Sequence, residues 1–289
     1  MLRRAVVLGS VALASACSLL VDSGGLSGDA PETRDGGDAT ATDGPSGLPS
    51  DGSIEAASDA GPDVVAVHPY VAAVLADGPI AYYRFEETTG FAAKTEVGTI
   101  DGVYSGAVTL AAPGAFTGSL GIALDGGLGG VSLGQAFDFV GRMPFSVEAW
   151  YEPTTYAPDF RFLISREGLD DAGRETYGIW FNPTTGSRMQ FERYVAGVKT
   201  GPGGDAPSTG TFHHIVGTYD GTTLALFVDA VLVDVSTDTR DARSTAVDCW
   251  IGRQSGEYAA LSGVIDEVAI YDKALPPTRI SAHFTSAGK

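Results

Sequence analysis

Glu148 and Glu152 are the two side chains whose type and spacing come nearest to a catalytic arrangement. Two carboxyl groups hydrolyse a glycoside when they lie about 5–5.5 Å apart in retaining enzymes or about 6.5–9.5 Å apart in inverting ones. The segment Glu148-Ala-Trp-Tyr-Glu152 lies in a predicted strand, where four residues separate the end Cα atoms by about 13 Å. This spacing disfavours catalysis by the pair, and we predict no catalytic residue.

The four histidines give no stronger signal. His213 and His214 are adjacent in a predicted strand, so their side chains point to opposite faces and do not form a metal-binding pair. His68 falls in a predicted linker and His283 in a predicted terminal helix. The sequence also lacks zinc-ligand spacing and a glycine-rich phosphate loop. We expect the histidines to be structural or surface residues.

The elements that position these residues are predicted to be short antiparallel strands. Residues 212–235 contain three runs of alternating apolar residues, separated by Asp220-Gly221 and Asp229-Ala230. Asp-Gly is a strong hairpin signal because glycine accepts the positive φ of the turn. Alanine tolerates a positive φ poorly, so we expect the second hairpin to use another turn type. Two successive hairpins form a meander, which is typical of an antiparallel β protein.

Similar short β runs recur along the rest of the chain, with glycine and proline between them. They are Ile80–Phe85, Gly106–Leu110, Gly121–Leu124, Gly130–Leu133, Phe145–Tyr151, Phe162–Arg166, Tyr177–Asn182, Met189–Val195, Cys249–Arg253 and Gly263–Tyr271. Tyr70–Leu75 is predicted to be a short helix, and a short amphipathic helix is predicted after Pro276-Pro277. This pattern favours an all-β sandwich of two antiparallel sheets with a short C-terminal helix.

Seven short motifs carry a resemblance to a known family. They are Ala81-Tyr-Tyr-Arg-Phe-Glu86, Ala123-Leu-Asp-Gly126, Pro144-Phe-Ser-Val-Glu-Ala-Trp150, the 212–234 meander, Trp250-Ile-Gly-Arg253, Gly263–Tyr271 and Leu275–Phe284. In this order they resemble the LamG-like jelly rolls of the concanavalin A-like lectin/glucanase superfamily. Two positions depart from the family pattern: Phe212 replaces a usual Trp, and Ala230 a usual Gly. The resemblance implies a jelly-roll sandwich over residues 69–289.

The resemblance also implies two kinds of site. Glucanases of this superfamily carry Glu-x-Asp-x-Glu on one strand, and here Trp150 replaces the middle Asp. Family members often hold a structural Ca²⁺ with an Asp of the final strand, which corresponds to Asp266. Glu86 and the Asp125-Gly126 loop are the expected co-ligands of this metal site, because Ca²⁺ binds carboxylate and carbonyl oxygens. The alternative is that Asp266 only caps the edge of the sheet.

A sugar site would use aromatic faces together with polar groups. The available aromatic residues are Trp150, Trp180, Tyr156 and Tyr194, although both tryptophans also suit a core. Long loops, where binding surfaces are common, are predicted at Pro153–Asp159, Glu167–Glu175 and Ala196–Thr209. The sequence does not identify specific ligand-binding residues.

The N-terminal region predicts export. Residues 1–16 have the charged start, apolar run and small-residue end of a signal peptide, and the run is too short to span a bilayer. Leu13-Ala-Ser-Ala-Cys17 resembles a bacterial lipobox, so Cys17 is the predicted lipid anchor; the alternative is simple secretion. Residues 17–68 are predicted to be a disordered acidic linker that spans about 40 Å.

Charge and cysteine content narrow the function further. Ser18–His68 carries ten acidic residues against the single base Arg34, out of a formal net charge of −18 for the chain. No basic stripe suits a phosphate backbone, which argues against nucleic acid as a partner. Cys249 lies beside Trp250 in a predicted strand, so we expect it to be a buried small hydrophobic residue, and acylation of Cys17 would exclude a disulfide.

The function that the sequence favours is non-catalytic binding of a glycan or protein partner, by a predicted lipoprotein at the bacterial cell envelope or surface. Two alternatives stay open. One is a glucanase-like enzyme that cleaves polysaccharides, and the other is a structural envelope protein. A fold of this kind does not by itself decide among the three.

Overall fold

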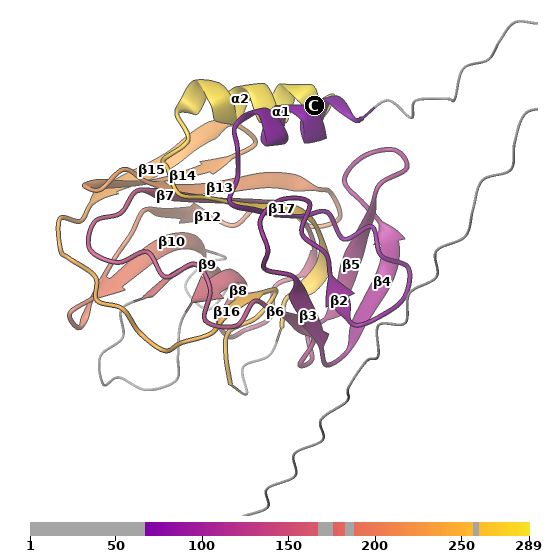
Figure 1. Ribbon diagram of the computed structural model, residues 1–289, viewed down its shortest axis with the longest axis horizontal. Helices are drawn as coiled ribbons and strands as arrows, with labels where there is room; N and C mark the ends of the chain where they lie inside the picture. The colour runs from indigo at the N-terminus through magenta and orange to yellow at the C-terminus, as the bar shows by residue number, and fades with distance from the viewer. Residues whose placement is uncertain (1–66, 167–175, 183–187, 257–259) are drawn as a thin grey trace, which may run out of the picture. The chain divides into compact units, whose positions relative to one another are not determined.

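The structure is a computed structural model that describes residues 67–166, 176–182, 188–256 and 260–289. The predicted signal peptide, Cys17, the linker up to residue 66 and the Glu167–Glu175 loop lie outside these residues. The described strands form two antiparallel sheets, A and B. Both helices lie on the face of sheet A that points away from sheet B (Figure 1).

Sheet A holds the strands that position most of the predicted site residues. Its spatial order is β15 (Val231–Thr237), β14 (Thr223–Val228), β13 (His213–Tyr219), β7 (Phe145–Thr155), β17 (Ser262–Tyr271), β5 (Leu120–Asp125) and β4 (Val108–Pro113), and β1 (Ala81–Tyr83) also pairs with β17.

Sheet B completes the sandwich. Its order is β11 (Val198–Thr200), β10 (Arg188–Val195), β9 (Thr176–Asn182), β8 (Arg161–Arg166), β16 (Cys249–Ile251), β6 (Gly130–Ser132), β3 (Gly102–Ser105) and β2 (Ala92–Ala93), and β12 (Gly203–Asp205) pairs with β10. This arrangement confirms the predicted two-sheet antiparallel jelly roll. The strands that the sequence did not predict are the short β2, β3, β11 and β12.

The core lies between the two sheets and follows from the period of two along each strand. In β7, Phe145, Val147, Ala149 and Tyr151 point into the core, whereas the residues between them point to the opposite face. Phe145 stacks on Phe139 with a ring separation of 4.6 Å. Aromatic packing of this kind adds to the stabilisation that apolar burial supplies.

A β-bulge in β17 places two consecutive acidic residues on the same side of sheet A. Asp266 is opposite Trp150, and Ala269 is opposite Glu148, so three steps along β17 match two along β7. Glu267 takes up the extra residue with a φ of 53°. As a result, Asp266 and Glu267 are both fully buried and lie outside the core between the sheets.

Helices α1 (Pro69–Ala76) and α2 (Pro277–Ser286) lie side by side over sheet A (Figure 1). We call the surface of sheet A beneath them the helix-covered face. Both helices begin with proline at the first turn, where its missing N–H costs nothing. His68 caps α1, because its Nδ1 accepts a hydrogen bond from the Tyr70 N–H at 3.2 Å. Neither of these two helices is both long and apolar enough to cross a bilayer.

The meander of residues 212–235 forms as predicted, but its second turn corrects one expectation. At the first turn, Gly221 has a φ of 100°, as the Asp-Gly signal requires. At the second, Asp229 and Ala230 have φ values of 50° and 64°, and Val228 pairs with Val231. This is a two-residue turn with positive φ at both positions, so the prediction of another turn type was wrong. The flanking pairing of β14 and β15 holds Ala230 in a conformation that alanine disfavours.

Candidate functional site

Glu148 lies on the helix-covered face and is fully buried. Its Oε1 accepts a hydrogen bond from the Tyr70 hydroxyl of α1 at 2.5 Å, and its Oε2 accepts one from the Tyr271 hydroxyl of β17 at 3.0 Å. His214 Nε2 lies 3.3 Å from Oε1, and His283 Nδ1 lies 3.1 Å from Oε2. Side chains from both helices and two neighbouring strands therefore converge on one carboxylate.

The neighbours of Glu148 also set its charge. Burial alone would raise the pKa of Glu148, but the charge of His283 and the hydrogen bonds of His214 and His283 hold it well below the usual carboxyl range. Burial would lower the pKa of His283, and the charges of Glu148 and Asp77 raise it instead. Asp77 lies 2.8 Å from His283 Nε2 and 2.8 Å from Arg279 Nε. The result is a buried ion pair that ties both helices to sheet A.

This geometry tests whether Glu148 and Glu152 can act as a catalytic pair. Glu148 has four side-chain partners and no contact with solvent, so no substrate reaches it in this arrangement. Glu152 lies four residues further along β7, about 13 Å away along the strand. Trp150, between them on the same face, is fully buried and stacks on His214 at 5.0 Å. No space between the two carboxyl groups could hold a glycosidic bond.

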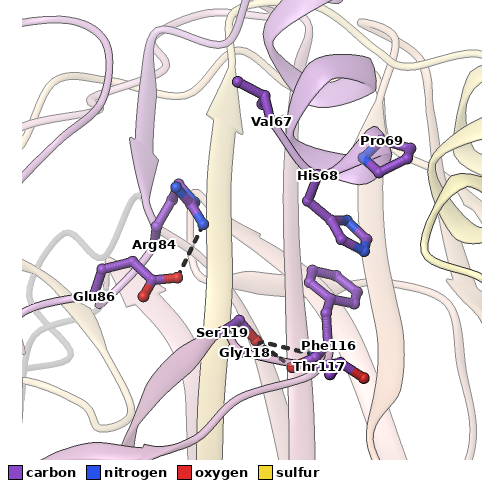
Figure 2. A pocket seen from close by; sticks show the side chains of 9 residues that line it. All are labelled: Val67, His68, Pro69, Arg84, Glu86, Phe116, Thr117, Gly118 and Ser119. Atoms are coloured by element: carbon purple, nitrogen blue, oxygen red, sulfur yellow. Dashed lines mark hydrogen bonds and ion pairs between the residues drawn. The ribbon is translucent and has the colours of Figure 1, made fainter. Parts of the chain in front are cut away.

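A cavity of about 620 Å³ opens at the start of α1, on the helix-covered face (Figure 2). Three segments line it: Val67–Pro69 before and at the start of α1, Arg84 and Glu86 after β1, and Phe116–Ser119 between β4 and β5. This volume suits a small ligand or one to two rings of a larger one. We call it the α1 pocket.

One wall of the α1 pocket is aromatic. The rings of His68 and Phe116 are nearly parallel, with centroids 4.5 Å apart (Figure 2). Behind them, Phe116 meets Trp150 edge-on at 5.4 Å and Tyr70 at 5.0 Å. Because the cluster behind the wall is buried, the wall is held rigidly. Thr117 and Ser119 add hydroxyl groups beside it.

The opposite wall is charged. Arg84 Nη2 lies 2.9 Å from Glu86 Oε1, Arg84 Nε lies 3.3 Å from Glu267 Oε1, and Arg84 Nη1 lies 3.8 Å from Glu96. Burial raises the pKa of Glu267 to about 7, although the Tyr82 hydroxyl and Arg84 both act in the opposite direction. One guanidinium therefore faces three carboxyl groups, of which Glu86 and Glu96 are partly exposed.

Asp266 lies behind Ser119, below the pocket floor. Its Oδ2 accepts hydrogen bonds from the Ala115 N–H at 2.8 Å and from the Ser119 hydroxyl at 3.2 Å. Its Oδ1 is buried without a hydrogen-bond partner. Burial, followed by repulsion from Glu267, raises the pKa of Asp266 well above its usual value. The contact requires glycine at position 114, since a Cβ there would lie 2.4 Å from Asp266 Oδ2.

The structure brings the three predicted calcium ligands only partly together. Glu86 lines the α1 pocket and Asp266 bonds the lining residue Ser119, but Glu86 is paired with Arg84. Gly126 lies at the other end of β5, where its N–H bonds Leu261, about 16 Å along the strand from Asp266. Within the described ranges, no three His, Cys, Asp or Glu side chains lie close enough to share a metal ion. Calcium binding stays a prediction, and it rests mainly on Asp266 Oδ1.

The predicted sugar-binding aromatics do not gather at one place. Trp150 is in the cluster beneath the helices, and Trp180 is nine-tenths buried against Phe160 on sheet B. Tyr156 bonds the Pro207 carbonyl at 2.8 Å, and Tyr194 lies on β10. None of the four lines the α1 pocket.

Among the residues that line the pocket, sequence reasoning named only Glu86 as a candidate ligand, and it missed the partners of Glu148. His68, placed at the end of the linker, instead caps α1 and forms a pocket wall. His213 and His214 do face opposite ways: His213 lies 2.7 Å from Asp229, and His214 contacts Glu148. A charged residue amid the outward positions of the apolar strand β7 was the available signal for the Glu148 cluster. Cys249 is buried, as predicted.

Two packed antiparallel sheets with these strand orders define a jelly-roll sandwich, and the α1 pocket lies on its helix-covered face. Residues 125–281, more than half of the chain, match the model of the Concanavalin A-like lectin/glucanases superfamily, and the chain belongs to that superfamily. No curated protein matches the chain.

Several solved structures share the fold at low identity. A sialidase of Trypanosoma rangeli, in complex with the inhibitor DANA, is similar with a TM-score of 0.52 and 15% identity over 72% of this chain and 32% of that one. The binding domain of botulinum neurotoxin serotype D is similar with a TM-score of 0.55 and 10% identity over 74% and 52%. This chain thus spans about a third and about half of those chains. At these identities the likeness shows the fold alone.

Proposed function

We propose that this protein is a non-catalytic glycan-binding module and that the α1 pocket is its binding site. The observation that carries the proposal is the pairing of a rigid aromatic wall with carboxylate and hydroxyl groups around one open cavity. A sugar ring presents C–H bonds on its faces, which pack on aromatic rings, and hydroxyls at its rim, which bond polar groups. The burial of Glu148 argues for binding rather than cleavage.

A glycan array tests this function with the soluble protein, residues 18–289. We expect binding of at least one glycan class, and Phe116→Leu should weaken it about tenfold or more, because leucine fills the space but removes the ring that stacks on His68 and holds the aromatic wall. Phe91→Leu is the matched control, since Phe91 is 84% exposed and lies outside the pocket. An array without any bound glycan, or equal losses in the two variants, would contradict the proposal. Binding of a protein partner but of no glycan would favour the protein-binding role that the sequence also allows.

The glucanase-like alternative is tested directly by activity. We expect no hydrolysis of laminarin or lichenan, because the Glu148 carboxylate is enclosed by Tyr70, Tyr271, His214 and His283. Hydrolysis that disappears in both Glu148→Gln and Glu152→Gln would establish the enzyme instead. A protein that neither binds nor cleaves a glycan would leave the role of a structural envelope protein.

We also propose that Asp266 holds a structural Ca²⁺, supported by its buried and unpartnered Oδ1. An ion that binds only the folded state adds about 2.7 kcal/mol at a hundredfold excess over its Kd. We therefore expect EGTA to lower the Tm by several degrees, and Asp266→Asn to remove this response while keeping one acceptor for Ala115. A Tm that ignores both Ca²⁺ and EGTA would leave Asp266 with only its hydrogen bonds to the β4–β5 loop.

A further inference from the structure

The charged side chains in and immediately around the α1 pocket are mostly acidic. Arg84 is the one arginine or lysine among its described lining residues, and Glu86, Glu96 and Glu267 all lie within 4 Å of its guanidinium. Even with Glu267 protonated, Glu86 and Glu96 outnumber Arg84. The field in the pocket therefore attracts cations and repels anions.

The guanidinium of Arg84 is not available to an anionic ligand. Its Nη2, Nε and Nη1 atoms each already face a carboxylate, the closest being Glu86 at 2.9 Å. A carboxylate on a ligand would have to displace one of these partners, and it would meet the remaining ones at close range. Glu86 is placed differently: its Oε1 faces Arg84, whereas its side chain is about a third exposed at the pocket wall (Figure 2). Glu86 can therefore accept a hydrogen bond from a ligand.

We propose that the ligand of the α1 pocket is a glycan with a free amine, a polymer of 2-amino sugars, with its ring against His68 and its ammonium at Glu86. This inference rests on the proposed glycan-binding function. The aromatic wall supplies affinity for a ring of any charge, and Glu86 supplies the preference for the ammonium. A charged hydrogen bond is stronger and shorter than a neutral one, so it discriminates between an amine and its acetylated form. Acidic glycans are excluded by the same carboxylates.

Calorimetric titration of residues 18–289 tests the inference with a matched pair of sugars. The probes are a β-1,4-linked glucosamine tetrasaccharide and its fully N-acetylated counterpart, at a pH where the free amine is protonated. We expect the amine form to bind about tenfold more tightly or better, which corresponds to about 1.4 kcal/mol. Added salt should narrow the difference. A galacturonic acid tetrasaccharide should not bind.

Variants separate the pocket from general attraction to an acidic chain. Glu86→Gln keeps the shape of the side chain and should bring the two sugars to equal affinity. Asp241→Asn removes one charge at a side chain that is 79% exposed and outside the pocket, and it should leave the preference unchanged. Phe116→Leu should weaken both sugars by the same factor. An unchanged Tm of Glu86→Gln shows that the fold is intact.

Each result decides something distinct. Equal binding of the two sugars by the unmodified protein, a preference that persists in Glu86→Gln, or binding of the acidic sugar would each overturn the amine assignment. If the array binds neutral glycans while the amine form fails, the binding function stands and this inference falls. If no glycan binds in either experiment, both fall.

Discussion

Ala230 occupies its turn at a cost in conformational energy. With a φ of 64° at the second position of the β14–β15 turn, it adopts the left-handed conformation that costs an L-residue about 1–2 kcal/mol. Ala230→Gly should relieve this strain and lose part of the gain to the greater freedom of glycine in the unfolded chain. We expect a net stabilisation of about 0.5–1 kcal/mol, measured as a higher midpoint in urea with an unchanged slope.

The control for this prediction is the same substitution at a strand position. Ala225 lies within β14, opposite Thr218, and its replacement by glycine should destabilise the protein by about 0.5–1 kcal/mol. Opposite signs at positions 225 and 230 would identify the φ of the turn as the cause. A loss of stability in Ala230→Gly would mean that the turn relaxes around alanine.

Glu148 shows what a sequence can and cannot indicate about one residue. Its position in an alternating strand predicts that it shares a face with Trp150 and Glu152, and the structure confirms this alternation. What covers that face depends on α1 and α2, whose Tyr70 and His283 are far from Glu148 in the sequence. Pattern alone therefore identified a candidate carboxylate, and tertiary packing determined that it is buried and ion-paired.

At the scale of elements, long alternating runs were predictable and short pairings were not. The hairpin of β13 and β14 follows from alternation and an Asp-Gly turn, both of which are local signals. Strands β2 and β12 have two and three residues, and β12 is Gly203-Gly-Asp205. Their pairing comes from the neighbouring strand β3 or β10 and not from their own side chains. No propensity in the sequence marks such strands.

The ion pair between Glu148 and His283 predicts how helix docking depends on pH. The folded pKa of His283 is raised, so its contribution to stability is full below the ordinary histidine pKa of about 6.5 and is lost as the pH rises through the folded value. The folded pKa of Glu148 is lowered, so its contribution is full above about 4.3 and is lost as the pH falls. We expect the Tm to be highest between these two limits.

His283→Gln tests the assignment, because glutamine can still donate a hydrogen bond but carries no charge. Removing one partner of a buried pair costs about 3–5 kcal/mol, and we expect about 3 kcal/mol here because Tyr70 and Tyr271 still bond Glu148. The Tm of the variant should be lower in the acidic window and should fall less steeply above it. His213→Gln is the control, since His213 pairs with Asp229 outside this cluster. A Tm profile of His283→Gln parallel to that of the unmodified protein would refute the assignment.

At the scale of the whole molecule, the sequence predicted the sandwich better than the pocket. The fold follows from many strands whose signals are repeated along the chain, so an error in one strand matters little. The α1 pocket depends on three segments, at residues 67–69, 84–86 and 116–119, that meet only when α1 docks on sheet A. No spacing in the sequence reveals that His68 stacks on Phe116. Such sites require the tertiary structure.

The N-terminal segment carries a separate proposal about where the domain is held. We propose that Cys17 is acylated after removal of residues 1–16, which is motivated by the Leu13-Ala-Ser-Ala-Cys17 segment. Residues 18–66 lie outside the described residues, and a flexible segment of that length would span about 40 Å from the membrane. Each buried acyl CH₂ contributes about 0.8 kcal/mol, so acylation at one cysteine decides whether the protein partitions with membranes.

Cys17→Ser should therefore move the protein from the membrane fraction to the soluble fraction of cells that express the full chain. The matched control is Cys249→Ala, because Cys249 is buried within β16, where acylation does not reach it, and this variant should fractionate like the unmodified protein. Mass spectrometry of the mature N-terminus identifies the modification itself. Equal membrane retention of Cys17→Ser, or an unmodified Cys17 in the membrane fraction, would contradict the anchor. If the unmodified protein and Cys17→Ser are both found in the soluble fraction with the signal peptide removed, the result would instead indicate simple secretion of the glycan-binding domain.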